Sequence, residues 1–261
     1  MNRYDKEDYI IEDFQELSTK EIYLLNNDIS TRKVLESIHK RKQWRKWVNS
    51  SSKKSLPPDF YNDQLGMMMD VMRVDDHSFV DHKGNVINPT LKRESQLIKE
   101  MIQLNPFLKK IAENGDIIVS ADSGLRGEKD HNYKFYCEGF NRVVDKHVKK
   151  IKNYKKNHPG YKMIFFILDE SSPYMVSTDS YRPRNPGEIV QGELHRWWSD
   201  YEMLKCFINS DVDYLIWFSP YKHFESVERI EPPFATIFDV KRIDYNSLIH
   251  YSEANVFSME A

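Results

Sequence analysis

The sequence predicts an α/β protein, a single three-layer domain whose mixed central sheet is flanked by helices. Helical patterns alternate along the chain with short apolar strands, which is typical of α/β architecture. Two of those strands, Lys162–Leu168 and Tyr214–Phe218, are continuously apolar, as central strands covered on both faces are. A length of 261 residues without a Ser/Gly-rich linker fits one large domain. We expect residues 1–29 to form an N-terminal polar arm and residues 30–261 to form the domain.

The first half of the chain shows helix and strand patterns separated by turn residues. Thr31 is a suitable cap for a helix with apolar residues on one face and lysines on the other. A Ser-rich basic loop ends at Pro57-Pro58, and Asn114-Gly115 ends a later helix. The predicted elements are helices over Arg32–Val48 and Leu91–Glu113, and strands over Leu65–Val74 and Asp116–Ala121.

The second half continues the alternation. Tyr133–Glu138 alternates in polarity and predicts a strand, and Gly139 then opens a helix that ends near Asn157, before His158-Pro159-Gly160. Further expected elements are the two apolar strands, a helix over Gly187–Asn209 and a last strand over Ala235–Val240.

Composition excludes several classes of protein. A charged fraction of 30% with 40% hydrophobic residues is too apolar for a disordered chain and too polar for a membrane protein. Two cysteines cannot build a disulfide scaffold, and the N-terminus lacks the apolar core of a secretion signal. We therefore expect a cytoplasmic protein with no membrane partner, and a homo-oligomer stays open.

The near-neutral total of 38 Lys+Arg against 40 Asp+Glu hides two basic stretches, residues 31–54 and 142–156. Local charge, more than net charge, decides whether a surface binds a polyanion. Trp44 and Trp47 stand beside arginines and could stack on bases. Nucleic acid is therefore an expected partner, although solvated helix faces and buried tryptophans would give the same pattern.

Two acidic residues stand where chemistry could use them. Asp70 interrupts the apolar strand Leu65–Val74, where a carboxylate is costly unless it is paired, hydrogen-bonded or metal-bound. Glu138 ends the strand predicted at Tyr133–Glu138 and shares one face of it with Lys134. The plain alternatives are a strand that leaves the core at Asp70 and an ordinary edge-strand surface at Glu138.

Three other groups of residues could also form a functional site. Asp169-Glu170 follows an apolar strand, and ligands of open α/β sheets bind at the carboxyl ends of strands, although turn capping explains the same residues. Asp239 and Lys241 also end a strand, as charges commonly do. His77 and His82 match no closed zinc pattern, so a solvated hairpin is expected there.

The order of elements resembles the PD-(D/E)xK (restriction-endonuclease-like) nucleases. A basic helix with Glu36 comes first, and Pro58-Asp59 precedes the strand that carries Asp70. The predicted strand Tyr133–Glu138 leads directly into a helix, and the apolar strand Lys162–Leu168 follows. The likeness covers about residues 30–170 and lies in the topology more than in the motif.

This resemblance implies a site for Mg²⁺ or Mn²⁺ held by Asp70 and Glu138. Lys134 would stand in for the motif lysine, and Glu36 would be the helix acid. The sequence departs from the family pattern at Gly139-Phe140, which leaves no lysine two places after Glu138.

The expected function is therefore that of a metal-dependent phosphodiesterase or nuclease acting on DNA or RNA. The alternative is a non-catalytic protein that binds nucleic acid or protein and has a nuclease-like α/β fold. A third hypothesis is a different hydrolase or transferase that uses Asp169-Glu170. The mapping of the nuclease site onto Asp70 and Glu138 requires their carboxylates to lie within about 4–6 Å, close enough to share one ion.

Overall fold

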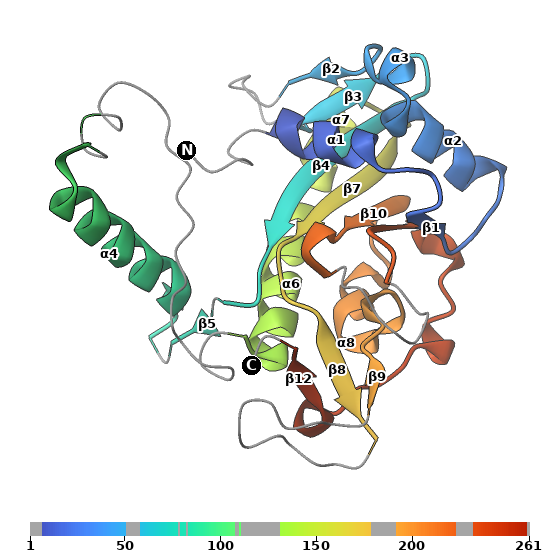
Figure 1. Ribbon diagram of the computed structural model, residues 1–261. Coiled ribbons are helices and arrows are strands. Elements are labelled where there is room, and N and C mark those ends of the chain that lie inside the picture. Colours follow the sequence, from blue (N-terminus) through green and yellow to red (C-terminus); the bar gives the residue numbers. More distant parts are fainter. Residues whose placement is uncertain are drawn as a thin grey trace.

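A seven-stranded mixed sheet with helices on both faces forms the body of the protein (Figure 1). The predicted α/β class with a single mixed central sheet is therefore confirmed. The computed structural model describes residues 7–50, 58–77, 79–81, 83–107, 110, 131–178, 192–222 and 232–259.

The central sheet joins an antiparallel part to a parallel part. Its strand order is β1-β11-β10-β7-β4-β3-β2. The strands β2, β3 and β4 form an antiparallel meander, β4, β7 and β10 run parallel, and β11 is antiparallel to β10 and parallel to β1. Their bounds are β1 Ile22–Leu24, β2 Val48–Asn49, β3 Phe60–Asn62, β4 Met67–Val74, β7 Lys162–Asp169, β10 Tyr214–Phe218 and β11 Ala235–Asp239.

The longest pairing joins β4 to β7 over eight residues, from Met67 opposite Lys162 to Val74 opposite Asp169. By contrast, β3 pairs only with residues 67–69 of β4. The second half of β4, which begins at Asp70, therefore extends past β3. That half-strand borders one of the candidate sites.

Helices α1 (Glu7–Glu16), α2 (Ile29–His39) and α3 (Arg41–Trp44) cover one face of the sheet (Figure 1). Asp28 caps α2 with both halves of a capping box. Ile10, Ile11 and Phe14 of α1 are fully buried against this face, and β1 belongs to the sheet. Residues 7–29 are therefore part of the domain, because the apolar stripe of α1 is core and only its outer side is polar. They do not form a separate polar arm.

The opposite face carries α6 (Tyr133–Val148), α7 (Ile151–Asn157) and α8 (Tyr201–Leu204). Phe140 of α6 stacks on Trp217 of β10, with ring centroids 4.6 Å apart. Helix α6 is the crossover between the parallel strands β4 and β7, and it runs the length of the sheet (Figure 1).

The strand predicted at Tyr133–Glu138 is wrong, because these residues form the first turns of α6. Asn132 caps the helix by accepting hydrogen bonds from the backbone N–H groups of Lys134 and Phe135. The alternation that predicted a strand is the start of a helical pattern, whose buried positions are Tyr133, Tyr136, Cys137, Phe140 and Val144.

Two other helix predictions need correction. The segment predicted as one helix over Arg32–Val48 divides into α2, α3 and β2. Within Gly187–Asn209, the described residues form β9, short helical turns and α8. Strand β9 belongs to a second sheet of order β12-β8-β9. The bounds are β8 Tyr174–Ser177, β9 Gly192–Leu194 and β12 Val256–Ser258, with 3₁₀ turns at Trp197–Ser199 and Lys205–Phe207.

The helix predicted over Leu91–Glu113 is observed as α4, which ends at Leu104, and the helix predicted from Gly139 to near Asn157 begins earlier and divides into α6 and α7. The strands β4, β7, β10 and β11 lie where the apolar runs placed them. The predicted strand Asp116–Ala121 lies outside the described residues. The other elements are β5 Phe79–Val80, β6 Val86–Ile87, α4 Pro89–Leu104 and 3₁₀ turns at Pro220–Lys222, Val240–Arg242, Tyr245–Ser247 and Glu253–Asn255.

Among the described residues, no helix combines the length and apolar character needed to cross a membrane.

The docking of α1 can be tested by mutation. Phe14→Ala should lower the free energy of unfolding by about 3–5 kcal/mol, because it leaves a cavity between α1 and the sheet. Tyr9→Ala on the exposed side of the same helix should change it by no more than about 0.5 kcal/mol. Urea denaturation of the full chain measures both, and equal small effects would show that α1 is not part of the core.

Candidate functional site

The structure does not bring Asp70 and Glu138 together. Asp70 lies in β4, is 2% exposed, and its Oδ2 lies 2.5 Å from Nδ1 of His147 on α6. Glu138 is exposed on the same helix, nine residues before His147. Nine residues correspond to about 13 Å along a helix axis and to its opposite side. The two carboxylates therefore cannot share one ion, because the segment that carries Glu138 is helical.

Lys134 and Glu36 also stand away from Asp70. Lys134 is exposed one turn before Glu138 on α6. Glu36 is exposed on α2 and forms an i,i+4 ion pair with Lys40 at 2.9 Å. Both are ordinary helix-surface residues, and neither reaches a buried acid.

Asp70 instead forms a cluster with three other residues at the edge of β4. Besides His147, the hydroxyl of Tyr154 on α7 donates to it at 3.2 Å. Asp59, just before β3, lies close enough to Asp70 for their carboxyl groups to hydrogen-bond and repel. In this cluster, Asp59 and Asp70 form an acidic pair between the sheet and the layer of α6 and α7.

Asp59 occupies the place where β4 runs past β3. Its Oδ2 accepts a hydrogen bond from the backbone N–H of Val71 at 2.7 Å, which satisfies a donor of the strand beyond the reach of β3. Burial and, next, the negative charge of Asp70 raise the pKa of Asp59 to about 8. The charge of Glu7 on α1 adds to this shift. The acidic pair therefore holds a proton near neutral pH.

A groove of about 420 Å³ runs beside this half of β4, between α1 and α6. It is lined by His147, which contacts Asp70, by Val71, whose backbone N–H donates to Asp59, and by three charged side chains, Glu7, Arg73 and Lys146. Lys146 is exposed on α6, directly before His147. The acidic pair thus adjoins an open groove that carries cationic groups.

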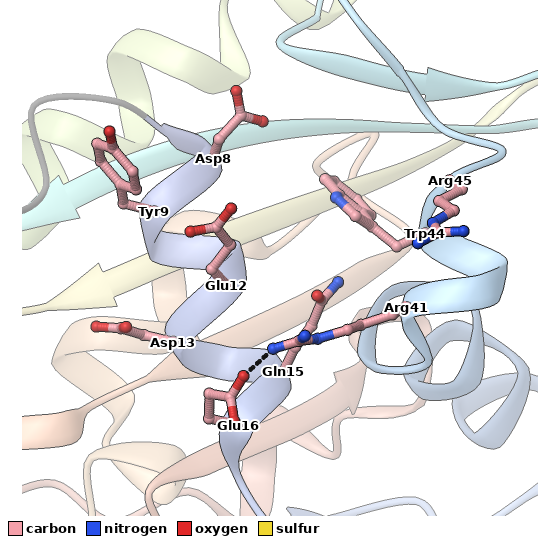
Figure 2. Close-up of a pocket in the computed structure, with 9 residues that line it drawn as sticks. All are labelled: Asp8, Tyr9, Glu12, Asp13, Gln15, Glu16, Arg41, Trp44 and Arg45. Carbon is pink, nitrogen blue, oxygen red and sulfur yellow. Dashed lines mark hydrogen bonds and ion pairs between the residues drawn. The ribbon is translucent and has the colours of Figure 1, made fainter.

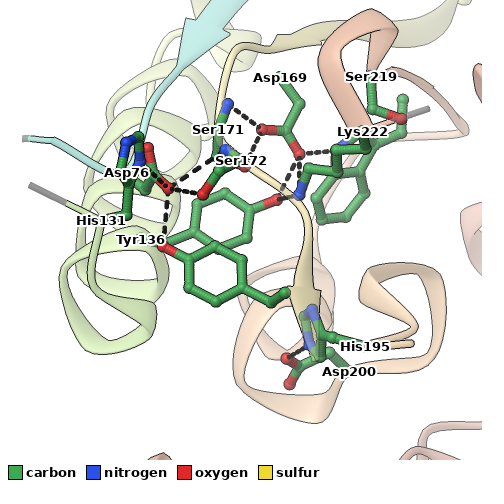
Figure 3. A network of polar contacts seen from close by, with 12 residues as sticks. Asp76, His131, Tyr136, Asp169, Ser171, Ser172, His195, Asp200, Ser219 and Lys222 are labelled. Atoms are coloured by element: carbon green, nitrogen blue, oxygen red, sulfur yellow. Dashed lines mark hydrogen bonds and ion pairs between the residues drawn. The ribbon is translucent and has the colours of Figure 1, made fainter. Parts of the chain in front are cut away.

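A second set of acids lies at the carboxyl ends of β4 and β7, in a buried polar network (Figure 3). Asp169 ends β7 and is fully buried; it accepts hydrogen bonds from Tyr136, from Trp217 at 2.8 Å and from Ser171. Its ion-pair partner Lys222 is 3.0 Å away and 1% exposed. Burial lowers the pKa of Lys222 against the opposing charge of Asp169.

Both carboxylate oxygens of Asp169 are thus satisfied inside the protein, and Glu170 pairs with Arg73 at 2.7 Å. Asp169 and Glu170 are therefore engaged in hydrogen bonds and ion pairs within the protein. The hydrogen bond from the backbone N–H of Ser171 to Asp169 is the turn capping that the alternative explanation named. Asp239 and Lys241 behave similarly, because Asp239 caps a 3₁₀ turn and Lys241 pairs with Asp213 at 2.6 Å.

Asp76 lies two residues after β4 and forms the second acidic centre of the network. Its Oδ2 accepts hydrogen bonds from Ser172, from Tyr174 at 2.7 Å and from His131 at 3.1 Å (Figure 3). Burial acts to raise the pKa of Asp76, but the hydrogen bond and charge of His131, with the charge of His77, lower it to about 2. Asp76, His77 and His131 could hold a metal ion, since one ligand atom from each lies within 4.8 Å of the others.

The third acid, Asp200, pairs with His195 at 2.7 Å, and the hydroxyl of Tyr133 donates to the same Oδ2 at 2.6 Å. Each of the three acids, Asp76, Asp169 and Asp200, thus accepts from one tyrosine and one cationic or imidazole group. Two of the three tyrosines, Tyr133 and Tyr136, come from the first turn of α6. The network therefore fixes the start of α6 against the ends of the strands.

The basic segment 31–54 faces acids in part. Figure 2 shows Arg41 of α3, and Arg45 directly after α3, across a pocket from the acidic side chains of α1; Arg41 forms an ion pair with Glu16. Trp47 is 8% exposed and its Nε1 donates to the carbonyl of Ser37, while Trp44 packs on Trp47. Trp47 is therefore a core residue, and its burial does not support the expectation that it stacks on bases.

Comparison of the chain with protein-family models, with curated proteins and with solved structures found no match.

Sequence reasoning missed two site residues. Asp59 stood in the Pro58-Asp59 pair, but its approach to Asp70 depends on the β3–β4 register. His131 lies 55 residues after Asp76, so no local spacing joined them. His77 was noticed with His82, yet His131 completes its cluster and His82 lies outside the described residues.

The raised pKa of Asp59 predicts a pH effect on stability. Between about pH 4 and pH 8, the unfolded chain has lost the Asp59 proton that the folded chain keeps, so this group destabilises the fold as pH rises. Asp59→Asn keeps the oxygen that accepts from Val71 but cannot ionise. The variant should gain stability relative to the natural chain between pH 5 and pH 8, measured by denaturant unfolding at both values. A difference that does not change with pH would contradict the shifted pKa.

Proposed function

We propose that the protein is a divalent-metal-dependent phosphodiesterase acting on nucleic acid, with its centre at Asp59 and Asp70. One observation carries the proposal: the neighbouring carboxyl groups of Asp59 and Asp70 contact Val71 and His147, which line an open groove that also carries Lys146. Phosphodiester cleavage needs both elements, hard oxygen ligands for a cation and positive charge for the phosphate.

The donor set suits Mg²⁺ or Mn²⁺. Carboxylate oxygens are the ligands that Mg²⁺ prefers, and it is commonly bound by one or two of them with the remaining places left to water and phosphate. The mutual repulsion of Asp59 and Asp70 is the electrostatic setting that a cation would relieve. When bound, the metal would polarise the phosphate and lower the pKa of a water molecule.

The side chains of the groove supply the other requirements. Lys146, which is exposed on α6, can neutralise phosphate oxygens of a bound strand, whereas Arg73 is already paired with Glu170. In the reaction, a water oxygen forms a bond to phosphorus, the bond from phosphorus to the leaving sugar oxygen breaks, and the proton lost by the water balances the one gained by that oxygen. His147 lies at the groove and contacts Asp70, so it can hold the carboxylate in place.

Part of the element order behind the resemblance to PD-(D/E)xK nucleases is present: antiparallel strands β2, β3 and β4 precede α6 and β7. The strand expected at Tyr133–Glu138 is missing from that order, because these residues begin α6. Asp59 stands in the Pro58-Asp59 pair and Asp70 in the next strand, so both acids now come from one hairpin. Lys146 takes the part that the resemblance had given to Lys134, because it lines the groove.

One observation favours the non-catalytic alternative. Met72, not a lysine, stands two residues after Asp70 on the same strand. A protein that only binds nucleic acid through Lys146 and the neighbouring basic residues would need no cation at Asp70. It would bind in a salt-sensitive manner, without cleavage at any concentration of Mg²⁺ or Mn²⁺.

The acidic pair is tested by its effect on cleavage. Asp59→Asn and Asp70→Asn should each reduce Mg²⁺- or Mn²⁺-dependent cutting of DNA or RNA by about 100-fold or more, as loss of an electrostatic group at a reaction centre does. The measurement is the cleavage rate of labelled single- and double-stranded substrates, with circular dichroism to verify folding.

Glu138→Gln is the matched control, because Glu138 is an exposed acid of α6 on the side away from Asp70. It should cut at the rate of the natural chain. Undiminished cleavage in both asparagine variants would remove Asp59 and Asp70 from the centre, and binding without any cleavage would favour the non-catalytic alternative.

A further inference from the structure

Only one of the two carboxylate oxygens of Asp76 accepts hydrogen bonds from the described residues. The residue is fully buried, and its Oδ2 accepts from the backbone and side chain of Ser172, from Tyr174 and from His131. Its Oδ1 is also buried but has no hydrogen-bond partner among the described residues. Nε2 of His77 lies 3.6 Å from this oxygen. A buried carboxylate oxygen in this position calls for a cation or a donor.

Two imidazoles from different parts of the chain lie beside this carboxylate, His77 near Oδ1 and His131 near Oδ2. His77 follows Asp76 directly, and His131 precedes the capping residue of α6. Their ring centroids are 4.7 Å apart, and the ligand atoms of all three residues lie within 4.8 Å of one another. We infer that Asp76, His77 and His131 form a binding site for one transition-metal ion of the zinc type, separate from the proposed phosphodiesterase centre.

Neighbouring groups already orient these ligands. The Oγ of Thr90, in the first turn of α4, lies 3.4 Å from Nδ1 of His77, on the ring side away from Asp76. Ser172 and Tyr174 hold Oδ2 of Asp76, and Oδ1 faces Nε2 of His77. Protein metal sites commonly fix their ligands through such outer contacts.

The donor set decides the class of metal. Two imidazole nitrogens and one carboxylate oxygen suit Zn²⁺ and Co²⁺, whereas Mg²⁺ favours oxygen ligands alone. Three protein ligands are also the number found in zinc sites that keep one position for water or another ligand. The site therefore differs in metal preference from the acidic pair at Asp59 and Asp70.

The two sites also lie far apart. His147, which contacts Asp70, follows His131 by sixteen residues, and most of that interval is α6, so the two ends are separated by roughly 20 Å along the helix. Metal at the Asp76 site would join the end of β4 to the start of α6, and the polar network of Figure 3 continues from there to Asp169. A metal ion at the Asp76 site would therefore fix the start of α6 to the end of β4.

Metal titration of the untagged full chain tests the inference. After treatment with a chelator and exchange into chelator-free buffer, Zn²⁺ titrated by calorimetry should bind with a stoichiometry of about one ion per chain. Co²⁺ should give a visible d–d absorption, and excess Mg²⁺ should not displace it. Saturating Zn²⁺ should raise the Tm by mass action.

Variants locate the binding. His77→Ala and His131→Ala should weaken Zn²⁺ binding by about 100-fold or more and abolish the Co²⁺ band, whereas Tyr174→Phe, which removes only an outer contact, should weaken it by about 10–100-fold. His250→Ala, an exposed histidine on another segment, should bind as the natural chain does. Asp70→Asn should also retain Zn²⁺ binding, which separates this site from the phosphodiesterase centre.

The natural chain alone can overturn the inference, by taking up no stoichiometric Zn²⁺ or Co²⁺. Uptake that survives in both His77→Ala and His131→Ala would overturn it equally. His77 is only partly buried, so its variant is expected to fold even if that of His131 does not.

Discussion

The parallel pairing of β4 with β7 is the interaction on which both candidate sites depend. It runs for eight residues and requires a crossover helix, which α6 provides. The pairing places Asp70 in the middle of a buried strand, under the last turn of α6, and Asp76 beyond its end, beside the first residues of that helix. One strand and one helix thus set an acidic centre at each end of α6. Because β3 is shorter than β4, the second half of β4 is not paired with β3, and two residues that contact the first centre, Val71 and His147, line the groove.

The negative charge of buried acids is compensated differently in the polar network of Figure 3 and in the Asp59–Asp70 cluster. Asp169 and Asp200 have tyrosine donors and basic partners, so their charges are balanced inside the protein. Asp59 is not balanced in this way, because its neighbour Asp70 is another acid and its pKa is raised to about 8. A carboxyl group with a raised pKa, next to another acid and close to a groove, is more typical of functional sites than of structural ones. This contrast favours the Asp59–Asp70 cluster over Asp169 as the place of chemistry.

Much of the fold could be predicted from the sequence, because apolar runs such as Lys162–Leu168 report burial on both faces directly. Asp70 was also identified correctly as a buried acid, since a carboxylate among methionines is costly without partners. The rest failed for physical reasons. Six residues of Tyr133–Glu138 fit two periods equally well, and only the cap at Asn132 and the later burial of Phe140 decide for a helix. That single error produced the pairing with Glu138.

The partners of Asp70 and Asp76 could not be predicted locally, because register and crossover geometry bring Asp59, His147 and His131 to them. In the proposed function, the Asp59–Asp70 pair binds a hard divalent cation in place of the proton that Asp59 carries. Calorimetric titration with Mg²⁺ at pH 7, in two buffers of different ionisation enthalpy, tests this claim most directly. It should reveal release of about one proton for each ion bound in the natural chain, and none in Asp59→Asn. Binding without proton release, or no binding, would contradict it.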